Sequence, residues 1–462
     1  MIDKLPVTIR EICRKIREAG GRAYLVGGCV RDLLLDLQPK DFDLEVYGIG
    51  MDQLHQQLSS LGRTETVGKS FGVIKLWLDS LEIDVALPRC ERKTSRGHRG
   101  FEVDFDPSMS PEEASSRRDF TINAMMLDPL DGKLFDFHGG RQDLERGILR
   151  HVSSAFSEDP LRVLRGMQFA SRFRLHLHVG TALLCRTLKQ DADSLAIERI
   201  WIEWRKWAEG EFPSYGLKVL EESRWVSLYP ELATMIGCPQ EPKWHPEGDV
   251  WHHILQVVDR ASKIAKRYSW SRERRYSLVF VALLHDLGKP ETTITDQKGR
   301  IRSPDHSIRG LKHSASFLGR IGAPASLLSY IQPLIKDHLT HMHGAPSDRA
   351  VRRLAARLVP SDIELWEALV EADASGRSPL PACRPALAWL EKAHSMQHHQ
   401  SKPVPIVTGK LLMEYGIEPG PEMGKIIREA YEAQLDGIIE NREEGRQWCI
   451  RHRYPQPDPA PD

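Results

Sequence analysis

The sequence has no long apolar run, no excess of one charge and no paired cysteine motif. None of its hydrophobic stretches reaches the roughly 20 residues of a membrane helix, and residues 1–20 are amphipathic and charged throughout, unlike a signal peptide. Lys and Arg number 64, as do Asp and Glu, so the formal net charge is zero and any nucleic-acid surface has to be local. The seven cysteines are dispersed without CxxC spacing, which is typical of reduced thiols. We therefore expect a cytoplasmic protein without a membrane segment.

The 462 residues exceed what one hydrophobic core usually organises, so several domains are expected. Up to about residue 150, short β-like runs alternate with helical stretches, which indicates a mixed α+β region. Beyond it, apolar residues recur at helical spacing, and Pro-rich breaks at 237–249 and 378–386 have the composition of linkers. The sequence predicts a multidomain α+β protein whose later regions are all helical, with domains at 1–150, 151–240, 245–378 and 379–462.

The stretch YLVGGCVRDLLLDLQPKDFDLEV combines a glycine turn with an acid-x-acid strand. Gly27 and Gly28 follow an apolar strand, and glycines let backbone amides approach a phosphate closely. The helix that follows favours anions at its N-terminus. Asp41 and Asp43 are two residues apart on the next strand, so both project from the same face. Clustered carboxylates suit Mg²⁺, and two such ions can activate a hydroxyl and stabilise a leaving pyrophosphate.

Each of these features has an ordinary structural explanation when it occurs alone. A glycine pair forms turns, and an acid-x-acid strand is usually a solvated face. The combination is much more specific because the two features occur in order and at short spacing. Asp84, in LEIDVAL, lies on a later strand and is a possible third carboxylate. Together they predict a site for nucleotidyl transfer.

Two further stretches carry side chains suited to nucleotide recognition. RRDFTIN, residues 117–123, places arginines for phosphate beside an acid and an amide for sugar hydroxyls, although a solvated basic turn is the plain alternative. In EDPLRVLR, residues 158–165, Asp159 and Arg162 are spaced to share a helix face, with Arg165 on the same stripe. Asp accepts from an exocyclic amine, which CTP and ATP both carry, and Arg donates to a ring nitrogen and carbonyl. The alternative is a surface salt bridge worth under about 1 kcal/mol.

On these motifs the chain resembles the class II tRNA nucleotidyltransferase and poly(A) polymerase family of the DNA polymerase beta superfamily. The resemblance rests on GGCVRDLLL…KDFDLEV, RRDFTINAM and EDPLRVLRGMQFASRF and extends over nearly the whole chain. It implies a polymerase-beta-like head at 1–150 and a helical neck at 151–240 for nucleotide selection and RNA binding. It also implies template-independent addition of CCA to tRNA 3′ ends from CTP and ATP, with Mg²⁺. Poly(A), CC-only and A-only addition stay open as alternatives.

The resemblance also implies roles for individual residues. Asp41 and Asp43 would bind Mg²⁺, and Asp84 is kept as a third catalytic carboxylate. Asp159 and Arg162 would form the protein template that selects C and then A. ERIWIEW, residues 198–204, fits the family's fifth motif only loosely, so it receives no role. The expected nucleotide-binding residues are Gly27, Gly28, Arg31, Asp32, Arg118, Asp119, Asn123, Asp159, Arg162 and Arg165.

Residues 89–103 gather arginines, a lysine and a histidine in a loop-like stretch. The stretch either contacts phosphates of the nucleotide or RNA, or is a solvated charged loop. In the family this region is a flexible loop, and shortened versions go with enzymes that stop after CC. The length found here favours addition of the terminal A.

The region after residue 245 is rich in His and Asp. DVWHHILQVVDRA, VALLHDLGKPETT, SPDHSIRGLKHSA, LIKDHLTHMHG and EADASGR follow in order, each on or beside an expected helix. His and Asp at these intervals can surround one or two metal ions from several helices. A single buried His is usually an ordinary core residue, but HD after an apolar run, with His upstream and Asp downstream, is far more specific. The pattern predicts a metal site.

This half resembles the HD phosphohydrolase superfamily, which implies a metal-dependent phosphohydrolase domain at 245–378. In nucleotidyltransferases that carry such a domain, it is associated with 2′,3′-cyclic phosphodiesterase and phosphatase activity. The metal would be a divalent transition metal or Mg²⁺. The implied ligands are His253, His285, Asp286 and Asp373, with His306 and His338 matching the extra histidines of binuclear members. The competing histidines are His252, His313, His341 and His343. Adjacent His252 and His253 cannot both point inward from one helix.

Residues 379–462 look helical and resemble the tail of HD-containing family members. They either complete the HD domain as a docking helix or contact the tRNA elbow. Two other functions compete with nucleotidyl transfer for the whole chain. In the first, the protein is chiefly an HD-type metal phosphohydrolase. In the second, it is an RNA-binding protein with inactive sites. The intact carboxylates and histidines argue against the last of these.

Overall fold

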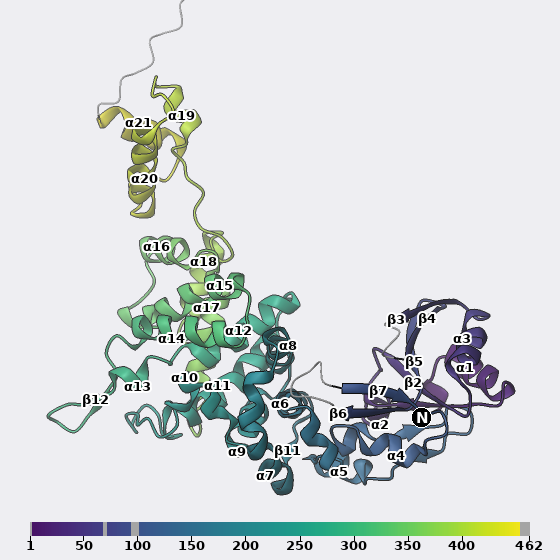
Figure 1. Cartoon of the computed structure of the whole chain (residues 1–462). Coiled ribbons are helices and arrows are strands. Elements are labelled where there is room, and N and C mark those ends of the chain that lie inside the picture. The colour runs from purple at the N-terminus through teal and green to yellow at the C-terminus, as the bar shows by residue number, and fades with distance from the viewer. Residues whose placement is uncertain (1, 68–71, 94–100, 453–462) are drawn as a thin grey trace, which may run out of the picture. The chain divides into compact units, whose positions relative to one another are not determined.

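The computed structural model describes residues 2–67, 72–93 and 101–452, which form two compact units, Met1–Leu228 and Tyr229–Asp462 (Figure 1). The first unit contains a mixed sheet with helices, and the second is almost wholly helical. The predicted multidomain α+β architecture is confirmed. The finer boundaries near 150, 240 and 378 stay predictions, since the compact units divide at one point, after Leu228.

The first unit is built on a seven-stranded sheet in the order β3-β4-β5-β2-β1-β8-β9. Its strands are β1 (Arg22–Val26), β2 (Phe42–Tyr47), β3 (Arg63–Val67), β4 (Val73–Leu78), β5 (Leu81–Ala86), β8 (Met126–Leu127) and β9 (Leu134–Phe135). β2 and β5 pair in parallel, and the other neighbours in this sheet are antiparallel. In β2, Phe42, Leu44 and Val46 are buried, whereas Asp43 is exposed. The period of two thus sends acidic and apolar side chains to opposite faces.

A separate antiparallel pair is formed by β6 (Arg89–Lys93) and β7 (Phe101–Phe105). The prediction of a loop over 89–103 is therefore wrong for both ends of that range, which form paired strands. The alternation of apolar and acidic residues in FEVDF favours a strand, and the density of charges obscured it. The centre of the expected loop, residues 94–100, lies outside the described residues.

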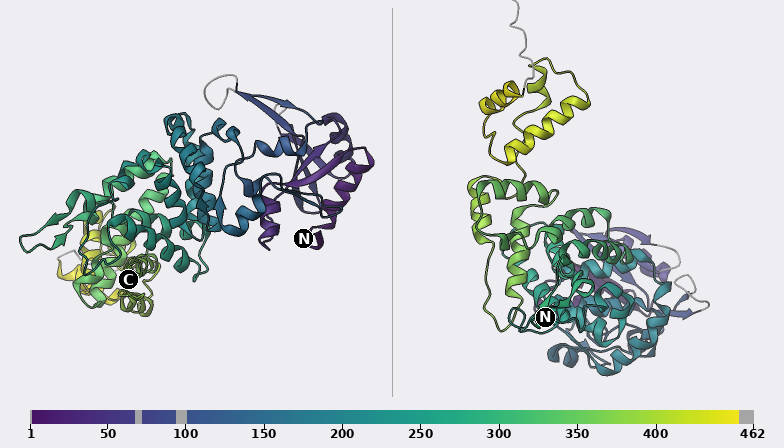
Figure 2. Two further views of the ribbon diagram at one scale, coloured as in Figure 1. Left: turned by 90° about the horizontal axis from the view of Figure 1, so that it is seen from below. Right: turned by 90° about the vertical axis from the view of Figure 1, so that its left-hand side faces the viewer.

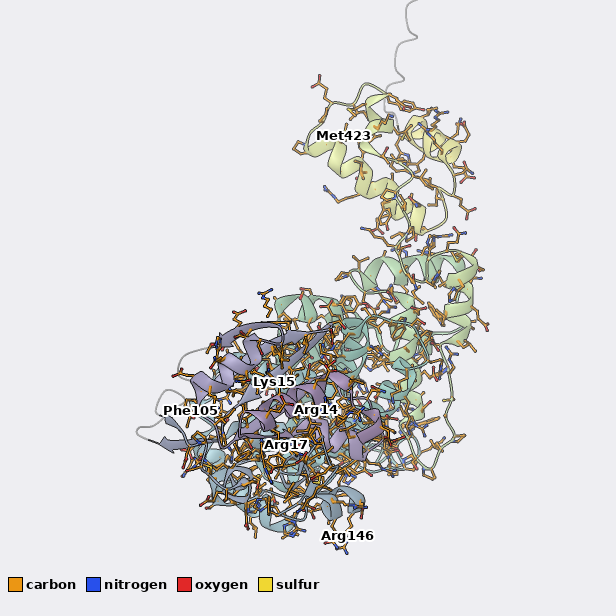
Figure 3. All side chains as sticks on the ribbon, turned by 90° about the vertical axis from the view of Figure 1, so that its right-hand side faces the viewer. Arg14, Lys15, Arg17, Phe105, Arg146 and Met423 are labelled. Carbon is orange, nitrogen blue, oxygen red and sulfur yellow. The ribbon has the colours of Figure 1, made fainter. Side chains whose placement is uncertain are left out.

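Five α-helices accompany the sheet: α1 (Val7–Glu18), α2 (Gly28–Leu34), α3 (Met51–Ser59), α4 (Pro111–Ser116) and α5 (Gly140–Arg146). α1 buries Ile9, Ile12 and Ile16 on one face. Arg14 and Arg17, labelled in Figure 3, are exposed on the other. This spacing of three and four residues is that of an amphipathic helix, which explains the charges throughout the N-terminal stretch.

Helices complete the first unit: α6 (Leu161–Phe173), α7 (Val179–Thr187), α8 (Ile197–Ala208) and α9 (Pro213–Glu222). α6 packs against both α8 and α9 around buried Trp204 and Trp207. Short turns and strands link this bundle to the head: η2 (Thr121–Asn123), η3 (Ser154–Glu158), β10 (Ile148–Leu149) and β11 (His176–Leu177). A Cβ at Gly166 of α6 would lie 3.0 Å from the ring of Phe120, so α6 and the RRDFTIN segment pack closely.

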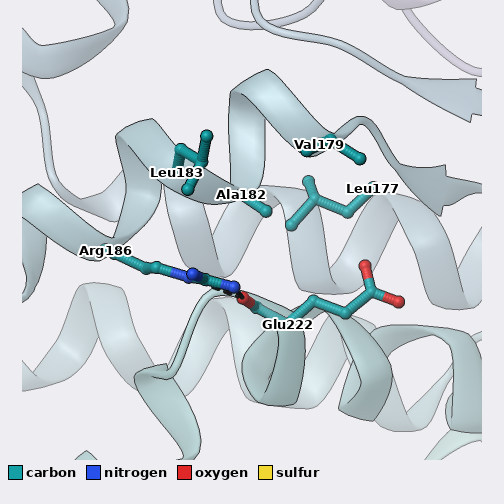
Figure 4. A pocket seen from close by; sticks show the side chains of 6 residues that line it. All are labelled: Leu177, Val179, Ala182, Leu183, Arg186 and Glu222. Carbon is teal, nitrogen blue, oxygen red and sulfur yellow. Dashed lines mark hydrogen bonds between the residues drawn. The ribbon is translucent and has the colours of Figure 1, made fainter.

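A pocket of about 270 Å³ lies beside α7 (Figure 4). Its lining residues are Leu177, Val179, Ala182, Leu183, Arg186 and Glu222. Arg186 donates from Nε and Nη2 to the backbone carbonyl of Glu222 at 3.1 and 3.0 Å, which ties α7 to the end of α9. None of the predicted nucleotide-binding or metal-binding residues lines this pocket.

The second unit is a helical bundle centred on α17 (Ile363–Ser375), which is buried along its whole length. α17 contacts α11 (Val250–Ala265) and α12 (Arg272–Leu284). The surrounding elements are α10 (Pro230–Ala233), α13 (Lys289–Thr292), β12 (Ile294–Thr295), β13 (Ile301–Arg302), α14 (His306–Arg320), α15 (Ala325–Asp337), η6 (Thr340–His343), α16 (Asp348–Leu358) and α18 (Leu387–Ser395). Side chains from facing helices of such a bundle core can together build an internal metal site.

The last helices, α19 (Gly409–Met413), α20 (Pro421–Leu435) and α21 (Arg442–Arg451), group together (Figure 2). They share a core of their own, which includes Leu412, Met423 and Trp448. Arg349 and Arg353 of α16 donate to the Asp436 carboxylate at 2.8 and 2.7 Å, next to the end of α20. The tail therefore contacts the HD region, as the docking alternative expects.

Among the described residues, no helix combines the length and the apolar character that crossing a membrane requires.

Candidate active sites

The acid-x-acid motif lies at the start of β2, beside β5. Asp41 immediately precedes β2 and is exposed, as is Asp43 within it. In the parallel pairing of β2 with β5, Asp43 is the partner of Asp84, so their side chains project from the same face. Nζ of Lys75 on β4 donates to Oδ1 of Asp84 at 2.9 Å. The structure thus brings the three predicted carboxylates to one sheet face, with a lysine at its edge.

Partial burial, and then repulsion from the neighbouring carboxylates, disfavour the charge on Asp43. The surrounding protein, and then the charge of Asp84, raise the pKa of Asp43 to about 6, although the Arg118 guanidinium counteracts this. A carboxylate cluster whose charges are mutually unfavourable is stabilised by a bound cation. Oxygen ligands of this kind fit Mg²⁺. The site residues therefore fit the metal that the motif predicts.

The glycine turn closes over this face. Gly27 has φ +74°, a left-handed conformation that other residues adopt at a cost. A Cβ at this position would lie 3.3 Å from Nη1 of Arg118 and 3.7 Å from Oδ2 of Asp43. Gly28 then begins α2. Gly27 therefore lets three predicted features meet: the turn, the Asp43 carboxylate and the RRDFTIN arginine.

A chain of hydrogen bonds joins most of the other predicted nucleotide residues. Nη1 of Arg31 donates to Oδ1 of Asn123 at 2.6 Å, and Nδ2 of Asn123 donates to Oδ1 of Asp119 at 3.1 Å. Nε of Arg165 donates to Oδ2 of Asp119 at 2.8 Å. Arg31 also donates to Asp32 at 2.6 and 2.9 Å. The chain links α2, the RRDFTIN segment and α6.

Three members of this chain are buried in the protein. Arg31, Asp119 and Asn123 are only 3, 7 and 6% exposed. Burial alone would raise the pKa of Asp119, but the Arg165 guanidinium and the Asn123 amide hold it below its ordinary value. The ionised carboxylate is therefore stable where it lies. These buried groups position their neighbours, whereas Arg118, with 23% of its side chain exposed and Nη2 3.3 Å from Oε1 of Glu45, remains accessible.

The predicted template pair is arranged differently from expectation. α6 begins at Leu161, so Asp159 precedes the helix, and its Oδ1 accepts from the backbone N–H of Leu161 at 3.1 Å. The prediction that Asp159 and Arg162 share a helix face is therefore wrong. Pro160 separates them, because proline starts a helix readily but restricts the residue before it to an extended conformation. Arg162 instead donates to the carbonyls of Ala155 and Arg117 at 2.8 and 2.9 Å.

Sequence reasoning missed one residue of this region. Nη2 of Arg199, on α8, donates to Oδ2 of Asp159 at 2.7 Å. Arg199 belongs to the stretch 198–204, whose loose fit to a family motif was the only available signal. Both oxygens of Asp159 thus have a partner, one local and one from a distant helix.

The second unit brings all six predicted metal ligands into one buried cluster. Their side chains come from five helices or helix ends: His253, His285, Asp286, His306, His338 and Asp373. Nε2 of His253 lies 3.2 Å from Oδ1 of Asp373, and Nε2 of His285 lies 3.3 Å from Oδ2 of Asp286. Nε2 of His306 lies 3.3 Å from Asp286 Oδ1 and from Nε2 of His338. Such spacing allows two adjacent ligand groups.

The histidine rings are held so that Nε2 faces inward. Nδ1 of His285, His306 and His338 lies 2.9, 2.7 and 2.7 Å from a backbone carbonyl three residues earlier. Within the described chain, Nε2 of His253 and Nε2 of His285 are buried and make no hydrogen bond of good geometry, although carboxylate oxygens lie 3.2 and 3.3 Å away. Buried polar atoms are normally satisfied, so these atoms have the geometry of ligands to a metal. The donor set fits a divalent ion.

Burial and neighbouring charges favour the metal-binding forms of His338 and Asp286. Burial and the neighbouring His285 and His306 lower the pKa of His338 to about 3, so its ring is neutral. Burial alone would raise the pKa of Asp286, but His285 and Lys289 hold it well below its ordinary value. Nζ of Lys289 lies 2.7 Å from Oδ2 of Asp286, and Nη2 of Arg377 donates to Asp373 at 2.8 Å. These two cations were not predicted, although both fall in the quoted HD and EADASGR stretches.

The competing histidines are directed elsewhere. The side chain of His252 is 63% exposed and contacts Asp249, while Nε2 of His313 contacts Glu291 at 2.8 Å. His343 is exposed, and the half-buried His341 places Nδ1 3.1 Å from the carbonyl of His338. None of the four belongs to a group of potential metal ligands among the described residues. The geometry therefore favours the six residues first predicted.

The predicted linker at 237–249 also reaches this cluster. The segment is irregular, as expected, but it belongs to the second unit and contributes His245 and Glu247. Burial alone would raise the pKa of Glu247, but hydrogen bonds from His245 and His253 lower it to about 2. The linker-like composition of 237–249 does not reveal this role, because the acidic and imidazole groups of residues 245–249, which the predicted HD domain includes, are buried by contacts distant in sequence.

Comparison with known families matches both units. Residues 23–150 match the Poly A polymerase head domain, and residues 250–371 match the HD domain. The fold and the two sites thus define a nucleotidyltransferase head combined with an HD-type metal domain.

Sequence similarity to curated proteins identifies the family within this class. A multifunctional CCA protein of Hahella chejuensis is 38% identical over 370 residues, covering 77% of this chain and 82% of that protein. One from Xanthomonas campestris is 37% identical over 387 residues, covering 81% of this chain and 90% of the other. The chain belongs to the multifunctional CCA protein family.

Solved structures show the same fold at lower identity. The CCA-adding enzyme of Bacillus stearothermophilus, in complex with CTP, is 21% identical with a TM-score of 0.61 and covers 96% of both chains. The Thermotoga maritima CCA-adding enzyme, complexed with tRNA, is 18% identical with a TM-score of 0.61, covering 98% of this chain and 97% of that one.

Proposed function

We propose that the protein adds CCA to tRNA 3′ ends, taking CTP and ATP as substrates without a nucleic-acid template. The observation that carries the proposal is the meeting of Gly27, Asp43 and Arg118 at one sheet face with Asp84. Family membership supports it, since the related structures include CCA-adding enzymes complexed with CTP, with ATP and with tRNA. A cytoplasmic location is inferred with it, from the dispersed cysteines.

Each group has a role in this reaction. The RNA 3′-hydroxyl attacks the α-phosphorus of the nucleotide, and pyrophosphate leaves. Asp41 and Asp43, with Asp84, would hold Mg²⁺, which when bound lowers the pKa of the hydroxyl and stabilises the pyrophosphate. Arg118 lies beside Asp43 and would donate charge-assisted hydrogen bonds to the triphosphate. The open glycine turn lets the phosphates approach the backbone.

Nucleotide selection is assigned to Asp159 and Arg162. Arg199 holds Asp159 from α8, and two backbone carbonyls hold Arg162. Both side chains are partly exposed, so their remaining donors and acceptors are available to a base. Asp159 would accept from the exocyclic amine shared by C and A, and Arg162 would donate to the ring.

The experiment that tests this function is transfer onto a tRNA transcript lacking CCA, resolved to single nucleotides. With both nucleotides we expect three additions, and with CTP alone we expect two. Two additions regardless of ATP would instead identify CC addition, and a long A ladder would identify a poly(A) polymerase. No extension at all would contradict nucleotidyl transfer.

A second activity is proposed for the HD cluster: metal-dependent hydrolysis of phosphate esters, including 2′,3′-cyclic phosphate ends. The inward-facing Nε2 atoms favour this assignment. Because imidazole ligands predominate, a transition metal such as Co²⁺, Ni²⁺ or Zn²⁺ suits the set better than Mg²⁺. In the reaction, water adds to phosphorus and one P–O bond breaks, leaving a monoester and a free hydroxyl.

This second activity is tested with an RNA that ends in a 2′,3′-cyclic phosphate. We expect the metal-free protein to be inactive, and we expect an added transition metal to restore hydrolytic opening of the cyclic phosphate. Equal hydrolysis in the presence of a chelator would contradict a metal site. A cyclic-phosphate substrate also separates this activity from nucleotidyl transfer, which needs a free 3′-hydroxyl.

A further inference from the structure

The irregular segment before α11 makes a specific contact with the metal cluster. The side chain of Glu247 is completely buried, and its Oε1 lies 2.8 Å from Nδ1 of His253. The same oxygen lies 2.9 Å from Nδ1 of His245. The other ring nitrogen of His253, Nε2, faces Asp373 and Asp286 at 3.2 and 3.8 Å. His253 thus lies between a carboxylate on one side and the predicted metal ligands on the other.

The protonation of the His253 ring follows from its surroundings. Nδ1 also lies 3.2 Å from the backbone carbonyl of Gly376. A carboxylate and a carbonyl are both acceptors, so Nδ1 has to carry the proton. In the neutral ring the lone pair is then on Nε2, and this is the form that binds a metal.

The same surroundings argue against a separate metal at His245, Glu247 and His253. Their ligand atoms lie close together. However, the Nδ1 to Oε1 distances of 2.8 and 2.9 Å are those of hydrogen bonds. A metal at this point would also require a lone pair on Nδ1 of His253, facing the Gly376 carbonyl. The contacts are therefore hydrogen bonds that fix the ring.

His253 differs in this respect from the other predicted histidine ligands. Nδ1 of His285, His306 and His338 faces a neutral backbone carbonyl. Among the four predicted histidine ligands, His253 is the one whose Nδ1 faces a carboxylate as well as a carbonyl. A charged acceptor makes the imidazole a stronger ligand and holds its orientation more firmly than a carbonyl does.

We propose that Glu247 is a positioning residue of the metal site, holding the Nδ1–H of His253 so that Nε2 is presented to the metal. His245 supports it by donating a second hydrogen bond to the same oxygen. The inference rests on the proposed metal-dependent phosphohydrolase and deepens it, because it assigns a function to a segment outside the matched HD domain.

The test uses the full-length, metal-free protein and Co²⁺ as the probe. Glu247→Ala removes the acceptor, and Glu247→Gln keeps an amide oxygen without the charge. Glu291→Gln is the matched control, since Glu291 contacts Nε2 of His313 at the same 2.8 Å but on the exposed side of the domain. Titration gives the Co²⁺ affinity, and the visible absorption bands of bound Co²⁺ report the ligand geometry.

We expect Glu247→Ala to weaken Co²⁺ binding by about 10- to 100-fold, the usual effect of losing an outer partner of a ligand histidine. Glu247→Gln should lose less Co²⁺ affinity, and Glu291→Gln should bind Co²⁺ as tightly as the parent protein does. The absorption bands should shift in Glu247→Ala at saturating Co²⁺, which a general loss of stability would not cause.

Parent affinity and parent absorption bands in both Glu247 variants would overturn the positioning role. If Glu247→Ala does not fold by circular dichroism, the isosteric Glu247→Gln decides by the same criteria. A parent protein that binds no Co²⁺ would instead overturn the proposed metal site itself, so the two failures are distinguishable.

Discussion

The two candidate sites hold their charged side chains in opposite environments. The head site places exposed carboxylates on an open sheet face, where they repel one another. The HD site buries its ligands and orients each histidine through Nδ1. An open acidic face suits hydrated Mg²⁺ that arrives with nucleotide phosphates, whereas a closed histidine cluster suits a resident metal. If the proposed functions hold, the head site is completed by its substrate, whereas the protein alone supplies the ligands of the HD site.

The largest expected effect comes from removing a carboxylate of the head. Asp43→Asn should lower nucleotide transfer by at least about 10³-fold, since the lost charge is required to hold Mg²⁺ at the reacting phosphate. Primer-extension rates on a tRNA lacking CCA measure this. Asp52→Asn, the same change at an exposed position of α3, is the control and should transfer normally. Comparable rates in both variants would remove Asp43 from the catalytic site.

The corresponding change in the HD cluster should affect the other reaction. Asp286→Asn is expected to lower cyclic-phosphate hydrolysis by at least about 10²-fold, because a charged ligand is lost and Lys289 keeps only a neutral partner. The variant protein should also retain less metal after dialysis, as measured by elemental analysis. Asp296→Asn, on the exposed hairpin of the same unit, serves as the control. Full hydrolysis with Asp286→Asn would contradict the ligand assignment.

The glycine turn gives a smaller and sharper test. Gly27 (φ +74°, ψ −136°) and Gly344 (φ +117°, ψ −172°) both lie outside the αL region that other residues can adopt, so Gly27→Ala and Gly344→Ala should each cost backbone strain of at least about 1 kcal/mol. Gly27 has the Arg118 and Asp43 side chains within 4 Å, whereas Gly344 has open space. We expect both variants to lose thermal stability but a raised KM for nucleotides in Gly27→Ala alone. Equal KM values would show that the close approach at Gly27 has no role in binding.

The smallest expected effect is on stability as a function of pH. The pKa of Asp43 is raised from 3.8 to about 6, so between these values the folded protein binds more protons than the unfolded chain. Stability from this group is therefore lost as pH rises through that window. Without Mg²⁺, Asp43→Asn should melt at a higher temperature than the parent at pH 7.5 and at the same temperature near pH 4. A difference of the same size at both pH values would contradict the shifted pKa.

Much of both sites follows from local patterns. The period of two in DFDLEV predicts that Asp41 and Asp43 share a face, and LEIDVAL predicts the strand that carries Asp84. HD after an apolar run predicts the core of the metal cluster, and burial then separates its six members from the competing histidines. In these cases the chemistry lies within a regular element, whose periodicity sets the direction of each side chain.

The errors arise where contacts are distant in sequence or the backbone is irregular. Asp159 was placed on a helix because its spacing to Arg162 is helical, but Pro160 puts the helix start after it. Arg199 lies 40 residues from Asp159, and no local pattern connects them. Glu247 lies in a Pro-rich stretch whose composition is that of a linker. Its burial depends on helices formed later in the chain, which composition does not reveal.

The division into two compact units has a consequence for how the protein evolves. Every residue assigned to nucleotide transfer falls before Leu228, and every residue assigned to the metal cluster falls after it. A mutation that damages one chemistry therefore leaves the side chains of the other intact. Selection can retain, retune or discard the hydrolytic half in one lineage while the tRNA-maturing half, on which translation depends, stays under constant constraint.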